Sequence, residues 1–123
     1  MKIERFEDIE DWKLGRQLAN LIYGFTANKP FAMDYGLRDQ IQRASGSVMH
    51  NIAEGFDSGL NPEFVRFLSY AKRSCTEVQS GLYLAVDRNY IAQNQFNSAY
   101  QLAEKAKATI GGFIRYLKTH PKP

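Results

Sequence analysis

Arg43 and His50 are side chains whose types could together cleave a phosphodiester bond. They are separated by six residues in a segment with helical spacing, so they share one face of the expected helix. A guanidinium stabilises charge that develops on a phosphate, and an imidazole transfers a proton near neutral pH. The alternative is an exposed helix histidine that lies near an arginine without acting with it.

The Arg43–His50 spacing resembles the R-x(4–6)-H pattern of HEPN-type ribonucleases, which are also helical bundles. The polar residue expected directly after the arginine is replaced by Ala44 in this sequence. A pattern this short arises often by chance. A ribonuclease is therefore the last of three functional alternatives, and we expect a protein that is not an enzyme and has no catalytic residues.

A stripe of polar side chains runs along the same segment, from Gly36 to Gly55. Its members recur at helical intervals and are Gln40, Arg43, Ser47, Asn51 and Glu54. A solvated face is one interpretation. Amides and a hydroxyl, however, are less usual there than Lys and Glu, and they suit a partly buried network between helices or between subunits. Glu77, next to Ser74 on the following helix, could pair with Arg43 and join this network.

The charge of the chain is unevenly distributed. The formal net charge is +3, but residues 1–11 hold five acidic and two basic residues, which leaves 14 basic against 8 acidic residues, a net +6, in the remaining 112. A basic body favours an acidic partner, with nucleic acid first. The candidate cations for phosphate contacts are Arg66, Lys72, Arg73, Lys105, Lys107, Arg115 and Lys118. For each of them, a solvated side chain is the alternative.

Other chemistry lacks the residues it needs. Helical di-iron sites use Glu-x-x-His pairs, and neither His50 nor His120 follows a glutamate at that spacing. Cys75 is the only cysteine, which excludes an intramolecular disulfide and a cysteine-rich zinc site, and we expect it in the core. Neither Ser45 nor Ser47 has a recognisable base and orienting acid. We expect no cofactor, no metal and no small-molecule substrate.

The sequence also lacks segments that address a chain to a membrane. No window of about 18 apolar residues exists, and the first residues contain no apolar run of signal-peptide length. The single cysteine is typical of a reducing compartment. We therefore expect a cytoplasmic protein without a membrane partner.

Four segments have the apolar periodicity of amphipathic helices, and no strand pattern competes with them. They cover about residues 9–27, 37–54, 62–88 and 94–118. Asp8 is expected to cap the first helix, Gly55 to follow the end of the second, and Asn61 to cap the third with Pro62 at its first position. Gly111 and Gly112 interrupt the last segment and indicate close helix packing or a kink.

The segments predict one domain, residues 1–123, with an all-α fold: an antiparallel, up-and-down four-helix bundle with short loops. Helices of this length are marginal alone in water, so each is held by packing its apolar stripe against the others. The first helix has two apolar faces, which indicates that it has neighbours on two sides.

Part of the sequence resembles a known family, the four-helix bundle proteins encoded by intervening sequences within bacterial 23S ribosomal RNA genes, also grouped as S23 ribosomal proteins. The similarity covers about residues 6–91. It is carried by Trp12-Lys13, Leu18-Ala19, Ile22-Tyr23, Thr26, Tyr35-Gly36-Leu37, Gln40-Ile41, Arg43-Ala44-Ser45, Ser47-Val48, Asn51-Ile52-Ala53-Glu54-Gly55, Glu63-Phe64, Phe67-Leu68, Ala71, Ser74, Glu77, Ala85 and Tyr90-Ile91.

The resemblance implies a four-helix bundle that assembles into a homo-oligomeric ring of five subunits. Related bundle proteins accompany reverse transcriptases and are thought to bind nucleic acid through basic surfaces. One position departs from the family pattern. Where the family has Ala-x-Gly-Ser, this chain has Ala71-Lys72-Arg73-Ser74, which places a cation at the position of a small residue.

Two functional hypotheses stand ahead of the ribonuclease. The first is a non-enzymatic oligomer that binds RNA, or RNA–protein complexes, through phosphate contacts. The second is a protein-interaction scaffold without nucleic acid, in which the polar stripe and Glu77 hold subunits or a partner in register. The two are compatible, because a ring repeats each basic patch around an axis and multiplies weak contacts.

Overall fold

The chain folds into four long helices that lie side by side, and its computed structural model describes residues 2–120. The all-α fold class is therefore confirmed, with no strand among the described residues. The helices are α1 (Glu10–Thr26), α2 (Tyr35–Ser58), α3 (Asn61–Asp87) and α4 (Gln93–Thr119), and two 3-10 turns precede α1 and α2, η1 (Phe6–Asp8) and η2 (Phe31–Met33). The periodicity of the sequence had not indicated either turn.

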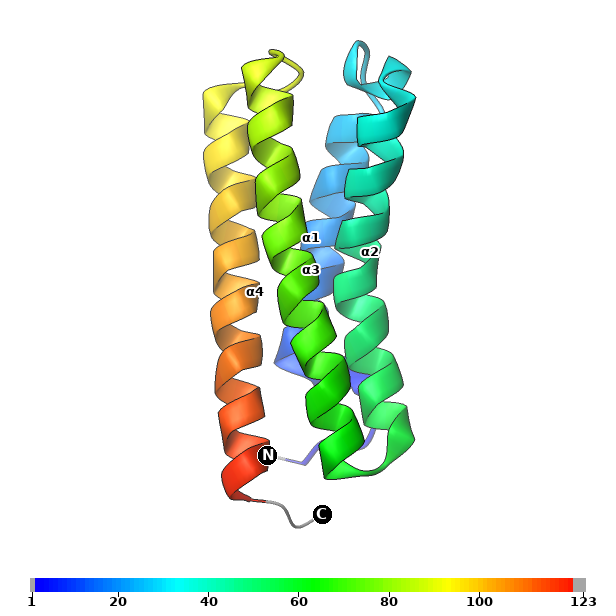
Figure 1. Cartoon of the computed structure of the whole chain (residues 1–123), viewed down its shortest axis with the longest axis vertical. Coiled ribbons are helices and arrows are strands. Elements are labelled where there is room, and N and C mark those ends of the chain that lie inside the picture. The colour runs from blue at the N-terminus through cyan, green and yellow to red at the C-terminus, as the bar shows by residue number, and fades with distance from the viewer. Residues whose placement is uncertain (1, 121–123) are drawn as a thin grey trace.

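Consecutive helices run in opposite directions, as Figure 1 shows. The α1–α2 and α3–α4 connections lie at one end of the bundle, and the α2–α3 turn lies at the other end. Each helix packs against two others, and α1 packs against α2 and α4. The two apolar faces of α1 are accounted for by these two neighbours.

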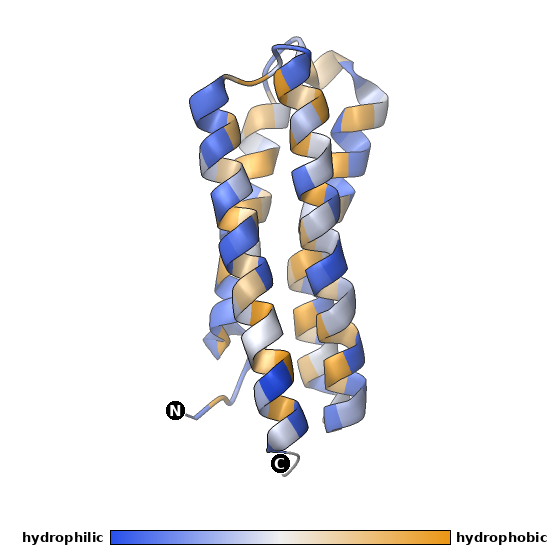
Figure 2. Ribbon diagram, turned by 60° about the vertical axis from the view of Figure 1, so that its left-hand side comes forward, coloured by the Kyte–Doolittle hydropathy of each residue, from blue (hydrophilic) through white to orange (hydrophobic). Residues whose placement is uncertain are grey.

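The core is built from the apolar stripes that the sequence predicts. Leu18, Ile22, Val48, Leu68 and Leu82 are completely buried. Figure 2 shows apolar residues gathered on the faces that the helices turn toward one another. The fourth helix contributes small side chains, which let helix backbones approach closely; its completely buried alanines are Ala99, Ala103 and Ala106.

Helix α2 is longer at both ends than the predicted segment. The carboxylate of Asp34 caps it by accepting a hydrogen bond from the backbone N–H of Leu37 at 3.2 Å, and the hydroxyl of Tyr90 donates to the same carboxylate at 2.9 Å. The helix ends at Ser58, and the next residue, Gly59, has the left-handed φ of 75° common at helix ends.

The prediction that Gly55 ends α2 is wrong. Gly55 lies inside the helix, and a Cβ atom there would be only 2.8 Å from Phe64 Cδ1 and from Phe67 Cβ. Glycine is needed at this position because α2 and α3 approach closely near the turn that joins them.

Two predicted helix caps also differ from the structure. The carboxylate of Asp8 accepts from the backbone N–H groups of Glu4 and Arg5, at 3.0 and 3.1 Å, so it holds the η1 turn while Ile9 occupies the cap position of α1. Leu60 precedes α3 as its cap, and Asn61 is the first helical residue. The amide of Asn61 donates instead to the carbonyl oxygen of His120 at 3.4 Å, across the end of the bundle.

None of the helices in residues 2–120 is long and apolar enough to cross a membrane.

Candidate nucleic-acid interface

A basic groove lies between α3 and α4, with a volume of about 490 Å³. Its lining combines four cations with two hydroxyls and one apolar side chain, and we call these residues the basic groove: Ser69, Lys72, Arg73, Thr76, Lys107, Ile114 and Lys118. Residues three, four and seven apart share a helix face, which is why each helix presents its members as a row. The structure therefore brings together four of the seven candidate cations.

Three of the four groove cations are not neutralised by the protein. Within residues 2–120, no side chain forms an ion pair with Lys72, Arg73 or Lys118, and all three are exposed. Arg73 lies over the ring of Tyr70, with its guanidinium carbon 5.2 Å from the ring centroid. These charges are available to an anionic ligand.

Lys107, the fourth groove cation, is part of a network that joins α3 to α4. Its Nζ donates to Gln79 Oε1 at 3.1 Å and to Thr76 Oγ1 at 3.3 Å, and it lies 3.8 Å from Glu104 Oε1. Gln79 is buried, and its amide nitrogen donates to the same Glu104 oxygen at 2.9 Å. Lys107 is therefore held by the protein and serves mainly to position the two walls of the groove. Neither Thr76 nor Gln79 had been predicted, because their role depends on which residues of α4 lie opposite α3.

Arg115 approaches the groove across Gly111. A Cβ atom on Gly111 would lie 3.7 Å from Arg115 Nη1 and 3.6 Å from Lys72 Nζ, so two cationic side chains from two helices meet over this glycine. The sequence indicated close helix packing or a kink at Gly111-Gly112. The close-packing interpretation is wrong, since the nearest atoms belong to the ends of flexible side chains, and α4 runs through the pair without interruption.

The two remaining candidate cations lie outside the groove lining. Arg66 forms an ion pair with Glu63, hydrogen-bonds the hydroxyl of Tyr70 at 2.9 Å and lies over the ring of Phe67. The hydrogen bond to Glu63 raises the pKa of Arg66 and lowers the pKa of Glu63. Lys105 is exposed and lies two residues from Lys107, about 200° around the helix, so it faces away from the groove.

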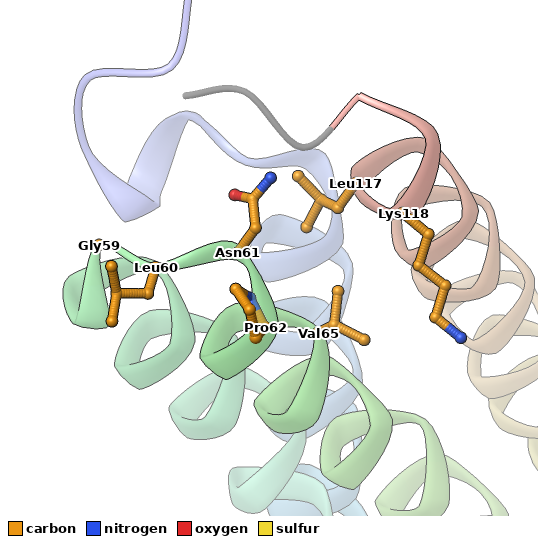
Figure 3. Close-up of a pocket in the computed structure, with 7 residues that line it drawn as sticks. All are labelled: Gly59, Leu60, Asn61, Pro62, Val65, Leu117 and Lys118. Atoms are coloured by element: carbon orange, nitrogen blue, oxygen red, sulfur yellow. The ribbon is translucent and has the colours of Figure 1, made fainter.

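An apolar pocket borders the basic groove at the end of the bundle. It has a volume of about 490 Å³ and is lined by Gly59, Leu60, Asn61, Pro62, Val65, Leu117 and Lys118. Figure 3 shows Leu60 of the α2–α3 turn with Pro62 and Val65 of α3 on one side, and Leu117 and Lys118 of α4 on the other. Lys118 lines both the pocket and the groove.

Comparison with known proteins identifies the family. The family model described as "23S rRNA-intervening sequence protein" matches residues 7–112. The chain belongs to this family. The match extends the resemblance read from the sequence into α4 and includes Lys72, Lys107 and Gly111.

A solved structure supports the fold of this family member. The chain is similar to a crystal structure, at 1.70 Å resolution, of a protein of unknown function from the S23 ribosomal protein family of Bacteroides thetaiotaomicron. The two share 21% sequence identity with a TM-score of 0.77, over 85% of this chain and 97% of the other. None of the curated proteins matches the chain.

The fold divides the polar stripe of this family member into two parts. Asn51 Nδ2 donates to Ser47 Oγ at 2.9 Å, and the buried Ser74 donates to the same oxygen at 3.1 Å, which links α2 to α3. Gln40, Arg43 and Glu54 are exposed on α2, and Glu77 is exposed on α3. The structure thus forms a helix-to-helix network from the middle of the stripe and leaves its two ends in solvent.

The predicted pair between Arg43 and Glu77 is not formed among the described residues. Glu77 and Gln40 instead line a small hollow of about 100 Å³ between α2 and α3. Within the described part of the chain, Arg43 therefore forms no ion pair that would explain its position in the stripe.

The surroundings of His50 are acidic. His50 is exposed and lines a shallow hollow with Phe6, Ala53, Glu54 and Asp57. The described residues include no hydrogen bond or ion pair between His50 and Arg43. Carboxylates beside an imidazole repel the phosphate that a ribonuclease must bind, so this site is less suited to RNA than the basic groove.

Two buried groups have pKa values far from their usual range. Cys75 is completely buried in the core, as predicted, and burial raises the pKa of its thiol to about 12, so it is not a nucleophile. Asp11 is 4% exposed, and its Oδ2 atom has no hydrogen-bond partner among residues 2–120. Burial raises the pKa of Asp11 to about 6.

Proposed function

We propose that this protein binds RNA, alone or within RNA–protein complexes, through phosphate contacts in the basic groove, and that it catalyses no reaction. The observation that carries the proposal is the set of exposed groove cations without a carboxylate partner, Lys72, Arg73 and Lys118. Such charges bind a polyanion by releasing its condensed counterions.

The composition of the groove supports phosphate contacts rather than base recognition. Cations and hydroxyls form most of its lining, and Ile114 is its only apolar member. Two aromatic rings of α3 are already covered by arginines: Arg66 and Arg73 lie over Tyr70, and Arg66 lies over Phe67. Phosphate contacts position a nucleic acid without reading its sequence, so we expect preference for structure over sequence.

We further propose that the protein is a homo-oligomer, with a ring of five subunits as the form that the family resemblance favours. The exposed ends of the polar stripe and of the neighbouring α3 face support an interface: Gln40, Arg43 and Glu77 are exposed there together with Leu84, whose exposed fraction is 44%. A ring would repeat the groove around its axis and multiply weak phosphate contacts. The proposal places the protein in the cytoplasm and requires no cofactor, metal or small-molecule substrate.

Light scattering with size-exclusion chromatography tests RNA binding and oligomeric assembly in one experiment. The purified protein is measured alone and with structured fragments of 23S ribosomal RNA, over a series of salt concentrations. We expect one oligomeric species that binds RNA, with affinity falling steeply as salt rises, by a slope of ~0.7 to 0.9 per phosphate neutralised. An oligomer that ignores RNA at low salt would contradict the RNA proposal, and a monomer would contradict the ring.

The second candidate function is a protein-interaction scaffold without nucleic acid. The observation that favours it is the exposed part of the polar stripe, since Arg43 and Glu77 have no ion-pair partner within the described part of the chain. An oligomer that does not bind RNA, but loses its assembly when Arg43 and Glu77 are replaced by alanine, would support the scaffold.

A further inference from the structure

Two cations from different helices meet where α4 has no side chain. Lys72 reaches across the basic groove from α3, and its Nζ and Cε lie 3.6 and 3.8 Å from the position that a Cβ atom would take on Gly111. Arg115 reaches back along α4, and its Nη1 lies 3.7 Å from the same position. We call this space the Gly111 notch.

The charges at the notch are not balanced by the protein. No carboxylate among the described residues pairs with Lys72 or with Arg115. The ion pair of α4, between Glu104 and Lys107, includes neither of these two cations. Like charges repel, and both side chains are long enough to turn into solvent. Their convergence on one point favours an anion at that point.

The two cationic groups at the notch suit a compact anion with several oxygens. The guanidinium of Arg115 donates in a planar fork that matches a phosphate, and the ammonium of Lys72 acts as a point charge that can approach from the other side. The missing side chain at Gly111 leaves room for an oxygen between them. A larger residue at this position would occupy that space.

We propose that the Gly111 notch binds one phosphate of an RNA backbone, shared by Lys72 and Arg115. This inference rests on the proposed function and adds a specific contact within it. The strand then continues along the groove, where Arg73 and Lys118 neutralise further phosphates. Arg115 lies outside the groove lining, so the notch adds a cation that the lining alone would not identify.

The salt dependence of RNA binding distinguishes a shared phosphate from two separate contacts. A structured 23S ribosomal RNA fragment is titrated with the wild-type protein, Lys72→Gln, Arg115→Gln and the double variant, with Lys105→Gln as a control that removes the same charge outside the groove. If the two side chains share one phosphate, the double variant loses ~0.7 to 0.9 in the salt slope. A loss about twice as large means two independent phosphates and overturns the proposal, as does a loss no greater than that of Lys105→Gln.

A second measurement tests the notch without RNA. Gly111→Glu places a carboxylate where the phosphate is expected, whereas Gly111→Gln places an uncharged side chain of the same shape. We expect Gly111→Glu to melt at a higher temperature than Gly111→Gln at low salt, with a difference that shrinks as salt rises. Equal melting temperatures would contradict an anion site. We also expect Gly111→Glu to weaken RNA binding more than Gln101→Glu, which adds the same charge at an exposed position of α4.

The outcomes separate this inference from the proposed function. If the wild-type protein does not bind RNA, the proposed function fails and the notch is no RNA site, even if Gly111→Glu is the more stable variant. If RNA binds and the notch variants behave like their controls, the groove function stands and the shared phosphate contact is wrong.

Discussion

The ammonium of Lys107 lies 3.1 Å from the side-chain oxygen of the buried Gln79, and this hydrogen bond joins the two walls of the basic groove. Because the amide nitrogen of Gln79 donates to Glu104 at 2.9 Å, one buried side chain holds a cation and an anion of α4 at once. A cation fixed in this way keeps α4 at a constant distance from α3. The other groove cations remain available to a ligand.

Replacing Gln79 with alanine tests the network between the two helices. The change removes three hydrogen bonds, those with Lys107, Glu104 and the backbone carbonyl of Tyr100, and leaves a cavity. We therefore expect it to lower the free energy of unfolding by roughly 2 to 4 kcal/mol. Urea denaturation measures the loss. The control is Gln101→Ala, an exposed glutamine of the same helix bundle for which a change below about 0.5 kcal/mol is expected. Equal effects of the two variants would show that the Gln79 contacts contribute nothing.

Substitutions of two helix glycines should have effects of opposite sign. Gly55→Ala places a methyl group 2.8 Å from Phe64 and Phe67, so we expect it to destabilise the protein by about 1 to 3 kcal/mol. Gly24→Ala has no atom within 4 Å of the new methyl group and gains helix propensity, so we expect stabilisation of up to about 1 kcal/mol. Thermal denaturation of both variants provides the comparison. A stabilising Gly55→Ala would contradict the close approach of α2 and α3.

The buried carboxyl of Asp11 makes stability depend on pH. Its pKa is about 6 in the folded protein and ~3.9 when unfolded, so the folded state binds the proton more tightly. The stability that the protonated Asp11 carboxyl gives to the folded state is present in full below about pH 4. It is lost as the pH rises through about 6. By linkage, the charged form costs roughly 2 to 3 kcal/mol above that range.

Asp11→Asn removes this titration. We expect the variant to be more stable than the wild-type protein at pH 8 and to have a weaker pH dependence between about 4 and 6. The free energy of unfolding is measured by urea denaturation across this range. Glu10→Gln is the matched control, because Glu10 is exposed on the same turn of α1. A curve for Asp11→Asn parallel to that of the wild-type protein would contradict the raised pKa.

RNA cleavage tests the ribonuclease alternative. His50 lies beside Glu54 and Asp57, and within residues 2–120 it forms no hydrogen bond or ion pair with Arg43. We therefore expect no cleavage of a 23S ribosomal RNA fragment by the wild-type protein. Gel electrophoresis after prolonged incubation provides the measurement, and His50→Ala is compared under the same conditions. Cleavage that disappears in His50→Ala would contradict the non-enzymatic proposal.

The sequence predicts the helices well because apolar periodicity depends on local spacing. Leu18, Val48 and Leu82 each lie on a predicted stripe and are completely buried in the structure. Helix ends were predicted less accurately. Gly55 has the residue type of a helix terminus, but its role is to admit two phenylalanines of α3, and that contact depends on how α2 and α3 cross.

The candidate site was predicted as a set of charges and not as a surface. The sequence identifies Lys72, Lys105 and Lys107 as candidate cations. Which of them face the same groove depends on how each helix is rotated about its axis in the bundle. Lys105 faces away, and Lys107 is held by Gln79, whose role no local pattern reveals. Gly111 was predicted to mark close helix packing or a kink, whereas the nearest atoms to its missing Cβ are the ends of the Lys72 and Arg115 side chains, at 3.6 and 3.7 Å.

Neutralising the free groove cations is the most direct test of RNA binding in the α3–α4 groove. The triple variant Lys72→Gln/Arg73→Gln/Lys118→Gln is compared with Lys13→Gln/Arg88→Gln/Lys105→Gln, which removes the same charge outside the groove, in equilibrium binding of a structured 23S ribosomal RNA fragment over a salt series. We expect the groove variant to lose ~1.4 to 2.7 units of the salt slope and most of its affinity, with the lower value if Arg115 keeps the phosphate that it shares with Lys72. The control variant should lose much less. Equal losses of affinity and salt slope in the two variants would mean that RNA binding depends only on the net charge of the protein. That result would contradict a binding site in the α3–α4 groove.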